Sequence, residues 1–310
     1  MTAPKCLPMI ALLGCTPLPE AIPQTGETTS LQTTPTGTTG SGTTSSTRGS
    51  TDTADTGLLF ADDRDQDSIP DDYDPFPDDP LRPGVAGHET IYAHDHSTLH
   101  YMNVVTYAIG TIGALSFVDA AGGSMTDIAI DRYGVLYGCT YTDLFVCHPQ
   151  SAECWHIGPL SGTYNGLTFV PAGTLDPNED VLVAIASSGD WYRLDGYLNQ
   201  QLTTSLIGGY GPGNYSSGDA FSIDSVGSWA AINGGHIVSV SPTDGTVGPE
   251  FATAGTNIWG LAGWLDEVFA FDASGQVFSI DPATGSTALI TTAPNSWWGA
   301  GVRTWIPPNP

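Results

Sequence analysis

The chain has 310 residues, and its 33 acidic against 7 basic side chains give a formal net charge of −26. Such an acidic chain repels the phosphates of nucleic acids, which excludes a nucleic-acid-binding role, and it favours solubility and cation binding. Many Thr, Ser, Gly, Asp and Asn residues suit strands and turns, and the sequence has no long amphipathic helical pattern. We therefore expect an all-β protein.

Residues 1–14 have the outline of a secretory signal, because the single basic residue Lys5 precedes an apolar run that is too short to span a bilayer. The sequence Leu-Leu-Gly-Cys that ends at Cys15 resembles the lipobox of bacterial lipoproteins. This resemblance implies cleavage before Cys15, lipidation of that cysteine, and anchoring to the bacterial outer membrane or cell surface. The alternative interpretation is a disordered N-terminus.

Residues 15–57 are dominated by Thr, Ser, Gly and Pro and contain few large apolar side chains. Such a segment cannot bury enough surface to fold, so we expect a disordered tether. A flexible tether after a lipid anchor would hold a folded domain away from the membrane.

The strongest chemical signal lies in residues 58–84, where nine Asp residues fall between positions 62 and 79. Counted from Asp63, carboxylates stand at positions 1, 3, 5, 9 and 12, and position 7 offers a backbone carbonyl. Ca²⁺ takes six to eight oxygen ligands, and this alternation folds a short loop around one ion. The pattern resembles a thrombospondin type 3 repeat. The predicted Ca²⁺ ligands are Asp63, Asp65, Asp67, Ile69, Asp71 and Asp74.

Position 6 of this pattern is Ser68, where the repeat family usually has Gly, so we expect a strained turn and a lowered affinity. With Ca²⁺ bound, the segment would form a stiff spacer below the domain that follows. The alternative is a solvated acidic linker, which is what charge runs usually are.

Residues 85–310 contain a repeat with a period of about 40 residues. A polar residue, small residues and then apolar alternation recur in five segments, which start near positions 125, 165, 218, 257 and 296. This period is typical of β-propellers, in which each blade is a four-stranded sheet. We predict a propeller with five blades. A β-sandwich is the alternative, but it does not explain a repeating blade.

One blade is predicted to take its strands from both ends of the domain. Residues 89–115 supply the second to fourth strands of a blade without a first strand, and residues 297–306 supply a first strand with nothing after it. Joining the two closes the ring and removes open sheet edges that invite aggregation.

Cys147 and Cys154 flank the turn between the third and fourth strands of one blade, so they should lie opposite each other across a hairpin. Opposed positions are near disulfide range, and an exported protein meets an oxidising compartment. We predict a Cys147–Cys154 disulfide with Cys139 unpaired. Two buried free thiols are the alternative. A transition-metal site at His94 and His96 is less favoured than a polar loop.

The loops that enter the first strands should gather at one mouth of the ring, where they bring polar and aromatic side chains together. Such a mixture suits a sugar or a peptide. The candidate ligand-binding residues are Asp127, Asn165, Asp219, Asn257, Trp259, Trp297 and Trp298. The alternative is that the Trp side chains pack between blades and that the Asp side chains cap turns.

Lipobox, tether, calcium repeat and propeller together resemble surface lipoproteins of bacteria. The resemblance implies a non-enzymatic, Ca²⁺-binding recognition or adhesion protein whose partner is a glycan, a peptide or a surface protein. A second hypothesis is a carbohydrate-active hydrolase that uses Asp127 and Asp219 as paired carboxylates. It requires these side chains to be open to solvent and not occupied by backbone N–H groups. A third hypothesis is a structural envelope component.

Overall fold

The computed structural model describes residues 62–253 and 255–307. The predicted signal peptide, Cys15 and the tether up to residue 57 lie outside this part of the chain. Within it, regular structure is almost entirely β, with two short 3-10 helices, η1 (Asp71–Tyr73) and η2 (Tyr197–Asn199). No helix of the described residues is long and apolar enough to cross a membrane.

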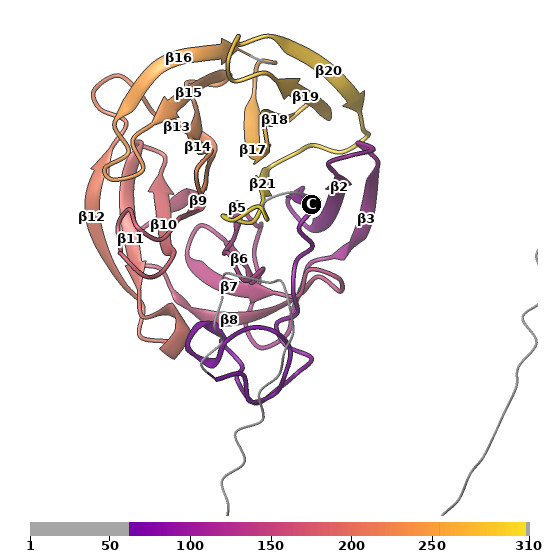
Figure 1. Cartoon of the computed structure of the whole chain (residues 1–310), viewed down its shortest axis with the longest axis vertical. Coiled ribbons are helices and arrows are strands. Elements are labelled where there is room, and N and C mark those ends of the chain that lie inside the picture. The colour runs from indigo at the N-terminus through magenta and orange to yellow at the C-terminus, as the bar shows by residue number, and fades with distance from the viewer. Residues whose placement is uncertain (1–61, 254, 308–310) are drawn as a thin grey trace, which may run out of the picture. The chain divides into compact units, whose positions relative to one another are not determined.

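Five sheets stand around a central axis, which confirms the predicted five-bladed β-propeller (Figure 1). From the axis outwards, blade 1 consists of β21 (Gly299–Gly301), β1 (Thr90–His94), β2 (Thr98–Asn103) and β3 (Ile109–Ala114). Blade 2 consists of β5 (Asp127–Ile130), β6 (Leu136–Cys139), β7 (Asp143–Cys147), β8 (Glu153–Pro159) and β4 (Ser116–Phe117). Blade 3 consists of β9 (Tyr164–Val170), β10 (Val181–Ala186), β11 (Asp190–Asp195) and β12 (Thr203–Gly209). Blade 4 consists of β13 (Ser216–Ile223), β14 (Gly227–Ile232), β15 (His236–Val240) and β16 (Val247–Thr253), and blade 5 of β17 (Ile258–Trp264), β18 (Glu267–Asp272), β19 (Gln276–Ile280) and β20 (Thr287–Thr292).

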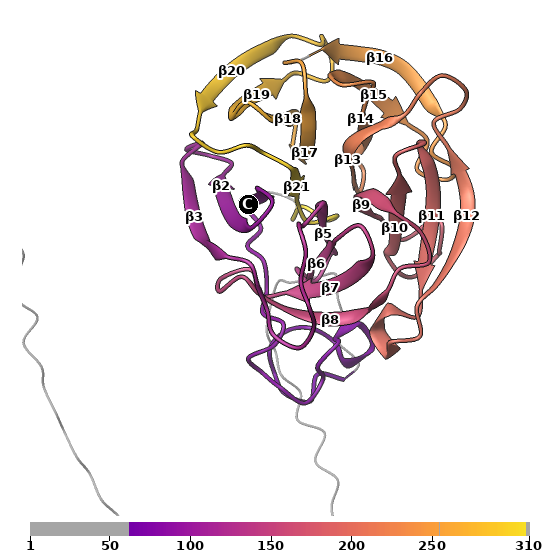
Figure 2. The same cartoon turned by 180° about the vertical axis from the view of Figure 1, so that it is seen from behind.

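The innermost strands are buried because neighbouring blades cover both of their faces. All four residues of β5 are buried, whereas no residue of the outermost strand β20 is buried. Seen from the opposite face, the same five inner strands surround the axis (Figure 2). Hydrophobic clusters fill the spaces between blades, as where Ile91 of blade 1 joins Phe269 and Phe271 of blade 5. The core of this protein therefore lies between its blades.

The ring closes in the predicted way, with a strand from the C-terminal end in the first blade. β21 pairs antiparallel with β1, so that Gly301 lies opposite Tyr92 and Gly299 opposite His94. The closing strand is shorter than the predicted range of 297–306, because Arg303 leaves the sheet and forms an isolated bridge with Ile130 of blade 2.

After β21 the chain crosses the mouth of the ring at which the inner strands end. Arg303 donates a hydrogen bond to the carbonyl oxygen of Arg132, which follows β5. Thr304 donates to the Asp180 carboxylate before β10, and its own carbonyl accepts the N–H of Asp224 after β13 at 2.7 Å. The last described residues therefore connect blades 2, 3 and 4 at this mouth.

Blade 2 carries the predicted disulfide. Cys147 on β7 and Cys154 on β8 are direct partners in the antiparallel register, and their sulfur atoms are bonded at 2.02 Å. Cys139 is buried and free. The sequence did not indicate β4, a short strand that runs parallel to β8 with Phe117 opposite Cys154. This strand covers the outer edge of the blade.

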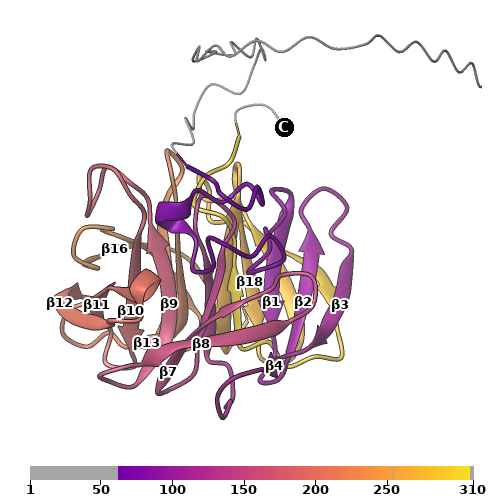
Figure 3. The same cartoon turned by 90° about the horizontal axis from the view of Figure 1, so that it is seen from below.

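The acidic segment over residues 62–84 packs against the ring, so it is not the separate spacer that we expected. Ile69 is fully buried within a cluster that includes Val135 and Tyr137 of blade 2. Tyr73 stacks on Tyr133 with ring centroids 4.6 Å apart. In a side view the segment, in indigo, lies on one face of the ring (Figure 3). Its apolar side chains, which the acidic pattern obscures, hold it there.

Candidate functional site

Two candidate sites lie on opposite faces of the ring. The acidic segment continues into Ala86, whose N–H donates to the carbonyl of Gly134 beyond the end of β5 at 2.8 Å. The second site is a pocket lined by Thr126 and Trp298, which stand immediately before β5 and β21. Because the inner strands run from one face of the ring to the other, the segment and the pocket lie on different faces.

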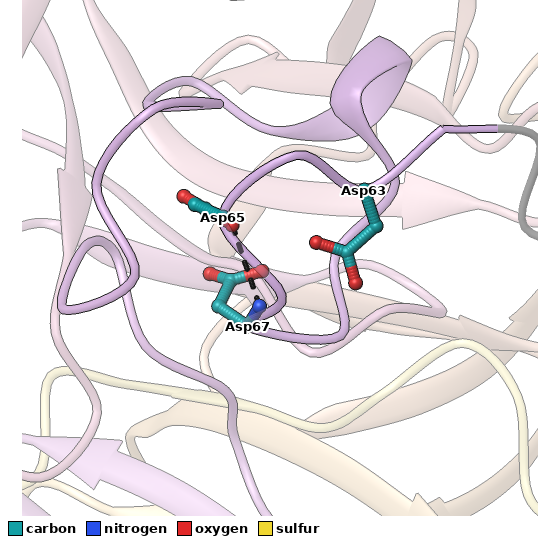
Figure 4. A group of neighbouring side chains, drawn as sticks. All are labelled: Asp63, Asp65 and Asp67. Atoms are coloured by element: carbon teal, nitrogen blue, oxygen red, sulfur yellow. Dashed lines mark hydrogen bonds between the residues drawn. The ribbon is translucent and has the colours of Figure 1, made fainter. Parts of the chain in front are cut away.

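The first candidate site is a cluster of carboxylates. Asp63, Asp65 and Asp67 each place an oxygen so that these atoms lie within 4.8 Å of one another (Figure 4). The loop backbone aims them: Asp63 Oδ1 accepts the N–H of Gln66 at 2.8 Å, and Asp67 Oδ1 accepts that of Ile69 at 2.8 Å. The clustering of these three predicted ligands fits a hard cation that takes oxygen ligands.

A fourth carboxylate, Asp74, lies near enough to this cluster for the charges of Asp67 and Asp65 to act on it. Its side chain is only 4% exposed, and its Oδ1 accepts the N–H of Phe76 at 2.7 Å. Asp74 Oδ2 is buried without a hydrogen-bond partner, and so are Asp65 Oδ2 and Asp67 Oδ2. A buried carboxylate oxygen without a partner is costly. A divalent cation is the kind of partner that carboxylate oxygens of this sort take.

The electrostatics of the cluster point the same way. Burial, with a smaller contribution from the neighbouring carboxylates, raises the pKa of Asp67 to about 6 and that of Asp74 to about 7. Both shifts report negative charge that is not compensated by the protein.

The other predicted ligands behave differently. Asp71 accepts hydrogen bonds from the backbone N–H of Arg64 at 3.0 Å and from its guanidinium Nε at 2.7 Å. These hydrogen bonds with Arg64 lower the pKa of Asp71, so its carboxylate already has a cationic partner. Ser68 has a φ of +81°, in the left-handed region that favours glycine, as its position in the pattern predicted. The Ile69 side chain serves as the hydrophobic anchor of the loop.

At the centre of the ring lies Asp127, the first residue of β5. Its Oδ1 accepts the N–H of Ile128 at 2.9 Å, and its Oδ2 accepts that of Leu167 in blade 3 at 2.6 Å. The backbone of Gly299 passes very close to Asp127 and to the buried His94. A Cβ at this position would stand 2.4 Å from Asp127 Oδ1 and 2.4 Å from His94 Nε2. Glycine is therefore required for this approach, and burial lowers the pKa of His94 to about 4.

Asp219 of β13 reaches the same centre from the other side. Its Oδ2 accepts the N–H of Leu261 in blade 5 at 2.6 Å and that of Ala300 in blade 1 at 3.0 Å. The Asp219 and Asp127 side chains also share a hydrogen bond. Burial raises the pKa of both carboxyl groups well above the usual range, and repulsion between the two groups adds to the shift of Asp127. The two residues thus connect the inner strands of all five blades.

The hydrolase hypothesis required Asp127 and Asp219 to be open to solvent. The structure does bring the two side chains together, but both are 0% exposed and both are occupied by backbone N–H groups. A sugar and its attacking water have no access to carboxyl groups in this state. As in the turn-capping alternative, the two carboxyl groups accept backbone N–H groups, but these belong to the inner strands of other blades.

The second candidate site is a pocket of about 210 Å³ at the mouth where the inner strands begin. Trp259 and Trp298 form part of its wall, with their rings perpendicular and their centroids 5.8 Å apart. Gly218 has a φ of +150°, and a Cβ on it would stand 2.8 Å from the carbonyl oxygen of Trp259. The lining residues are Thr126, Tyr141, Asn165, Ser217, Gly218, Trp259 and Trp298.

Three of the predicted ligand-binding residues, Asn165, Trp259 and Trp298, line this pocket. Trp297 does not, because it is fully buried between Phe271 and His100, with ring centroids 5.6 Å and 5.3 Å away. Its role is packing between blades.

Asn257, another predicted ligand-binding residue, is exposed and stands outside the lining. Sequence reasoning missed Tyr141, which comes from the turn between the second and third strands of blade 2. In a propeller blade, the turn between the second and third strands lies at the same mouth as the start of the first strand. This regularity could have predicted that Tyr141 lies near the pocket.

No family model and no curated protein matches the chain. Among solved structures, it is similar to a chain in a crystal structure of a nidogen/laminin complex, with a TM-score of 0.43 and 13% identity over 69% of this chain and 80% of that chain. It is also similar to a structural genomics protein of unknown function from Bacteroides thetaiotaomicron, with a TM-score of 0.44 and 14% identity over 71% of this chain and 63% of that chain. A structure from work on the de novo evolutionary emergence of a symmetrical protein has a TM-score of 0.45 and 15% identity over 69% and 98%. At these levels of similarity the matches identify neither a ligand nor an activity.

Proposed function

We propose that this protein is a Ca²⁺-binding, non-enzymatic recognition protein, anchored to the bacterial surface through a lipid on Cys15. The β-propeller is a scaffold for ligand binding or recognition. The pocket between Trp259 and Trp298 is the recognition site, and the acidic segment on the opposite face of the ring is the calcium site. Anchoring rests on the sequence that ends at Cys15 and on the tether composition of residues 15–57.

The observation that carries the calcium assignment is the buried Oδ2 atom of Asp74, which has no hydrogen-bond partner. This atom belongs to the same loop segment as the cluster of Asp63, Asp65 and Asp67. An acidic linker in solvent would turn its carboxylates toward water, and it would have no reason to bury one of them. Ca²⁺ with oxygen ligands removes both the repulsion between these groups and the cost of burial.

Calcium binding would also affect the ring. The loop that carries the carboxylates contributes Ile69 to a cluster shared with blades 2 and 3, and Phe76 packs edge-on against Trp155 at 5.4 Å. A cation that binds the folded loop and not the unfolded chain stabilises the whole docked unit by mass action. Calcium thus acts as a structural ion that keeps the segment on the ring.

Calorimetric titration of the purified protein with Ca²⁺ tests the assignment. We expect saturable binding that is lost when Asp65 and Asp67 are changed together to Asn. The matched control is Asp72→Asn, because Asp72 is exposed in the same segment and lies outside the cluster. Absence of saturable binding in the unchanged protein, or equal binding by the double variant, would refute the calcium site.

The anchoring is tested separately. In a bacterial host fed a labelled fatty acid, the protein should incorporate the label and fractionate with membranes, and Cys15→Ala should abolish both. An unlabelled protein that is released into the medium contradicts the anchor, and it leaves the calcium site untouched.

A further inference from the structure

The pocket at the mouth where the inner strands begin is electrically neutral in a very acidic protein. Among its seven lining residues there is no Asp, Glu, Lys, Arg or His. The chain as a whole has a formal charge of −26, and its field repels anions. The pocket offers no cationic group to compensate that repulsion, so its chemistry disfavours phosphates, sulfates, uronic acids and other anionic ligands.

The aromatic part of the lining presents ring surface in a fixed orientation. Trp259 and Trp298 are both partly exposed, with perpendicular planes. The backbone N–H of Trp298 donates to the carbonyl of His94 at 2.8 Å, and the ring lies 5.8 Å from that of His96. Rigid aromatic faces suit flat ligand surfaces that carry C–H groups. Tyr141, 48% exposed, extends this wall.

The polar part of the lining consists mainly of acceptors. Asn165 Oδ1 is buried without a partner, whereas its Nδ2 donates to the carbonyl of Ser216 at 3.4 Å. The Ser217 hydroxyl oxygen already accepts the N–H of Gly234 at 2.6 Å. The Thr126 hydroxyl donates to the Cys139 carbonyl at 3.0 Å. A fitting ligand therefore brings its own O–H or N–H donors, above all for Asn165 Oδ1.

An extended peptide fits this mouth less well than a compact polyol. Peptides commonly add a strand to an open sheet edge. The inner edges of β9, β17 and β21 are occupied, because Asp127 and Asp219 accept the N–H groups of Leu167, Leu261 and Ala300. What stays available is a short pocket that suits the end of a chain.

We infer that the pocket binds the terminal, uncharged sugar residue of a glycan. The C–H face of the sugar ring packs on Trp259 or Trp298, and a sugar hydroxyl donates to Asn165 Oδ1. The inference rests on the recognition role proposed above and specifies the ligand class for it. It also assigns Tyr141 and Ser217 to the site.

The test uses the whole protein in Ca²⁺ buffer, with tryptophan fluorescence and calorimetry as readouts. The probes are the methyl glycosides of glucose, galactose, mannose, N-acetylglucosamine and N-acetylgalactosamine, with glucuronic acid and tetramethylammonium as charged comparisons. We expect at least one neutral glycoside to bind saturably with a Kd on the order of millimolar, as is typical of a single small polar ligand. The charged probes should not bind.

Variants locate the binding. Trp298→Ala and Asn165→Ala should each weaken it by about tenfold or more, as lost stacking and an unsatisfied hydroxyl require. Tyr141→Ala, in an exposed turn where folding is not at stake, should also weaken it. Trp305→Phe is the matched control, since Trp305 lies after β21 beside His88 at the other mouth and should leave binding unchanged.

Three outcomes would overturn the inference: no neutral glycoside binding up to about 50 mM, binding of a charged probe or an arrayed peptide instead, or binding that the pocket variants do not change. Calcium calorimetry on the same sample separates the two proposals. If the protein binds Ca²⁺ but no sugar, only the sugar inference is refuted. If it does not bind Ca²⁺, the calcium site is refuted, and the pocket variants alone decide the sugar inference.

Discussion

Asp219 shares a hydrogen bond with Asp127 at the centre of the ring, and both carboxyl groups are shut off from solvent. Two adjacent buried carboxylates do not both ionise, so the pair holds a proton near neutral pH. Asp219 Oδ1 has no other partner, whereas both oxygens of Asp127 accept backbone N–H groups. By this geometry the proton belongs on Asp219 Oδ1, the one oxygen of the pair that accepts no N–H group.

This asymmetry predicts opposite results for two similar variants. In Asp219→Asn the amide NH₂ replaces the carboxyl O–H and donates to Asp127, so stability at pH 7 should hold or rise. In Asp127→Asn an NH₂ group faces the N–H of Ile128 or Leu167, which should cost about 1–3 kcal/mol. Urea unfolding of both variants provides the measurement. Equal losses in the two variants would contradict this placement of the proton.

The same pair predicts a pH dependence. Burial raises the folded-state pKa values of Asp127 and Asp219. In the unfolded chain an Asp carboxyl group loses its proton at a pH of about 4, whereas the folded state keeps the proton to a higher pH. The contribution of this pair to the free energy of unfolding is therefore fully present at low pH, and it is lost as the pH rises toward the folded-state pKa values. Asp131, whose pKa burial raises to about 7, adds a loss of the same sign up to that pH.

Asp219→Asn should make the decline with pH shallower, because it removes one titrating group of the pair. Urea unfolding in Ca²⁺ buffer at pH 5 and pH 8 measures the slope for the variant and for the unchanged protein. Parallel slopes would show that the decline comes from groups elsewhere.

Ser68→Gly should strengthen Ca²⁺ binding. The φ of +81° strains a residue with a Cβ, and glycine relieves a net cost of about 1 kcal/mol, which corresponds to about a fivefold gain in affinity. Ser68→Ala is the matched control, since it removes the same hydroxyl and keeps the strain. Calorimetry in which both variants bind alike would mean that the backbone angle does not limit affinity.

Ile69→Ala tests whether the acidic segment belongs to the folded unit. Ile69 is 0% exposed in a cluster shared with blades 2 and 3, so truncation should cost about 2–5 kcal/mol of stability and weaken Ca²⁺ binding. Leu81→Ala, at a side chain that is 77% exposed, should change neither. A segment that acted as a separate spacer would leave the urea unfolding of the ring the same in Ile69→Ala.

The Cys147–Cys154 disulfide closes a short hairpin loop, with a sequence separation of 7. Loop entropy predicts that replacing both cysteines with Ser lowers stability by about 2–3 kcal/mol. A reducing agent should lower the Tm of the unchanged protein in the same direction, and it should leave the double variant as it was. Cys139→Ala keeps the disulfide, so its response to the reducing agent should match that of the unchanged protein.

The blade architecture was predictable because each blade repeats its own pattern, and the incomplete repeat at residues 89–115 required a partner at residues 297–306. The docking of residues 62–84 was not predictable, because Ile69, Tyr73 and Phe76 are too few to give a periodic signal among nine Asp residues. Tyr73 and Phe76 pack against Tyr133 and Trp155, which are far from them in the sequence.

Of the candidate ligand-binding residues, Asn165, Trp259 and Trp298 line one pocket, but the sequence did not distinguish buried from exposed side chains among them. Trp297 and Trp298 are neighbours on one strand-like stretch, and alternation sends one into the core and the other to the pocket. The register that decides between them depends on the pairing of Gly299 with His94 across the ring closure. No local pattern contains that information.

The closing strand also sets the order in which the protein is completed. Tyr92 and Gly301 pair although they are more than 200 residues apart, so a chain made from its N-terminus exposes the inner edge of β1 until residues 299–301 have been synthesised. A translating or translocating chain is thus an open arc with one unpaired edge, the state that is most prone to pairing with other chains. Truncation before residue 299 would leave every molecule in that state, with the inner edge of β1 unpaired.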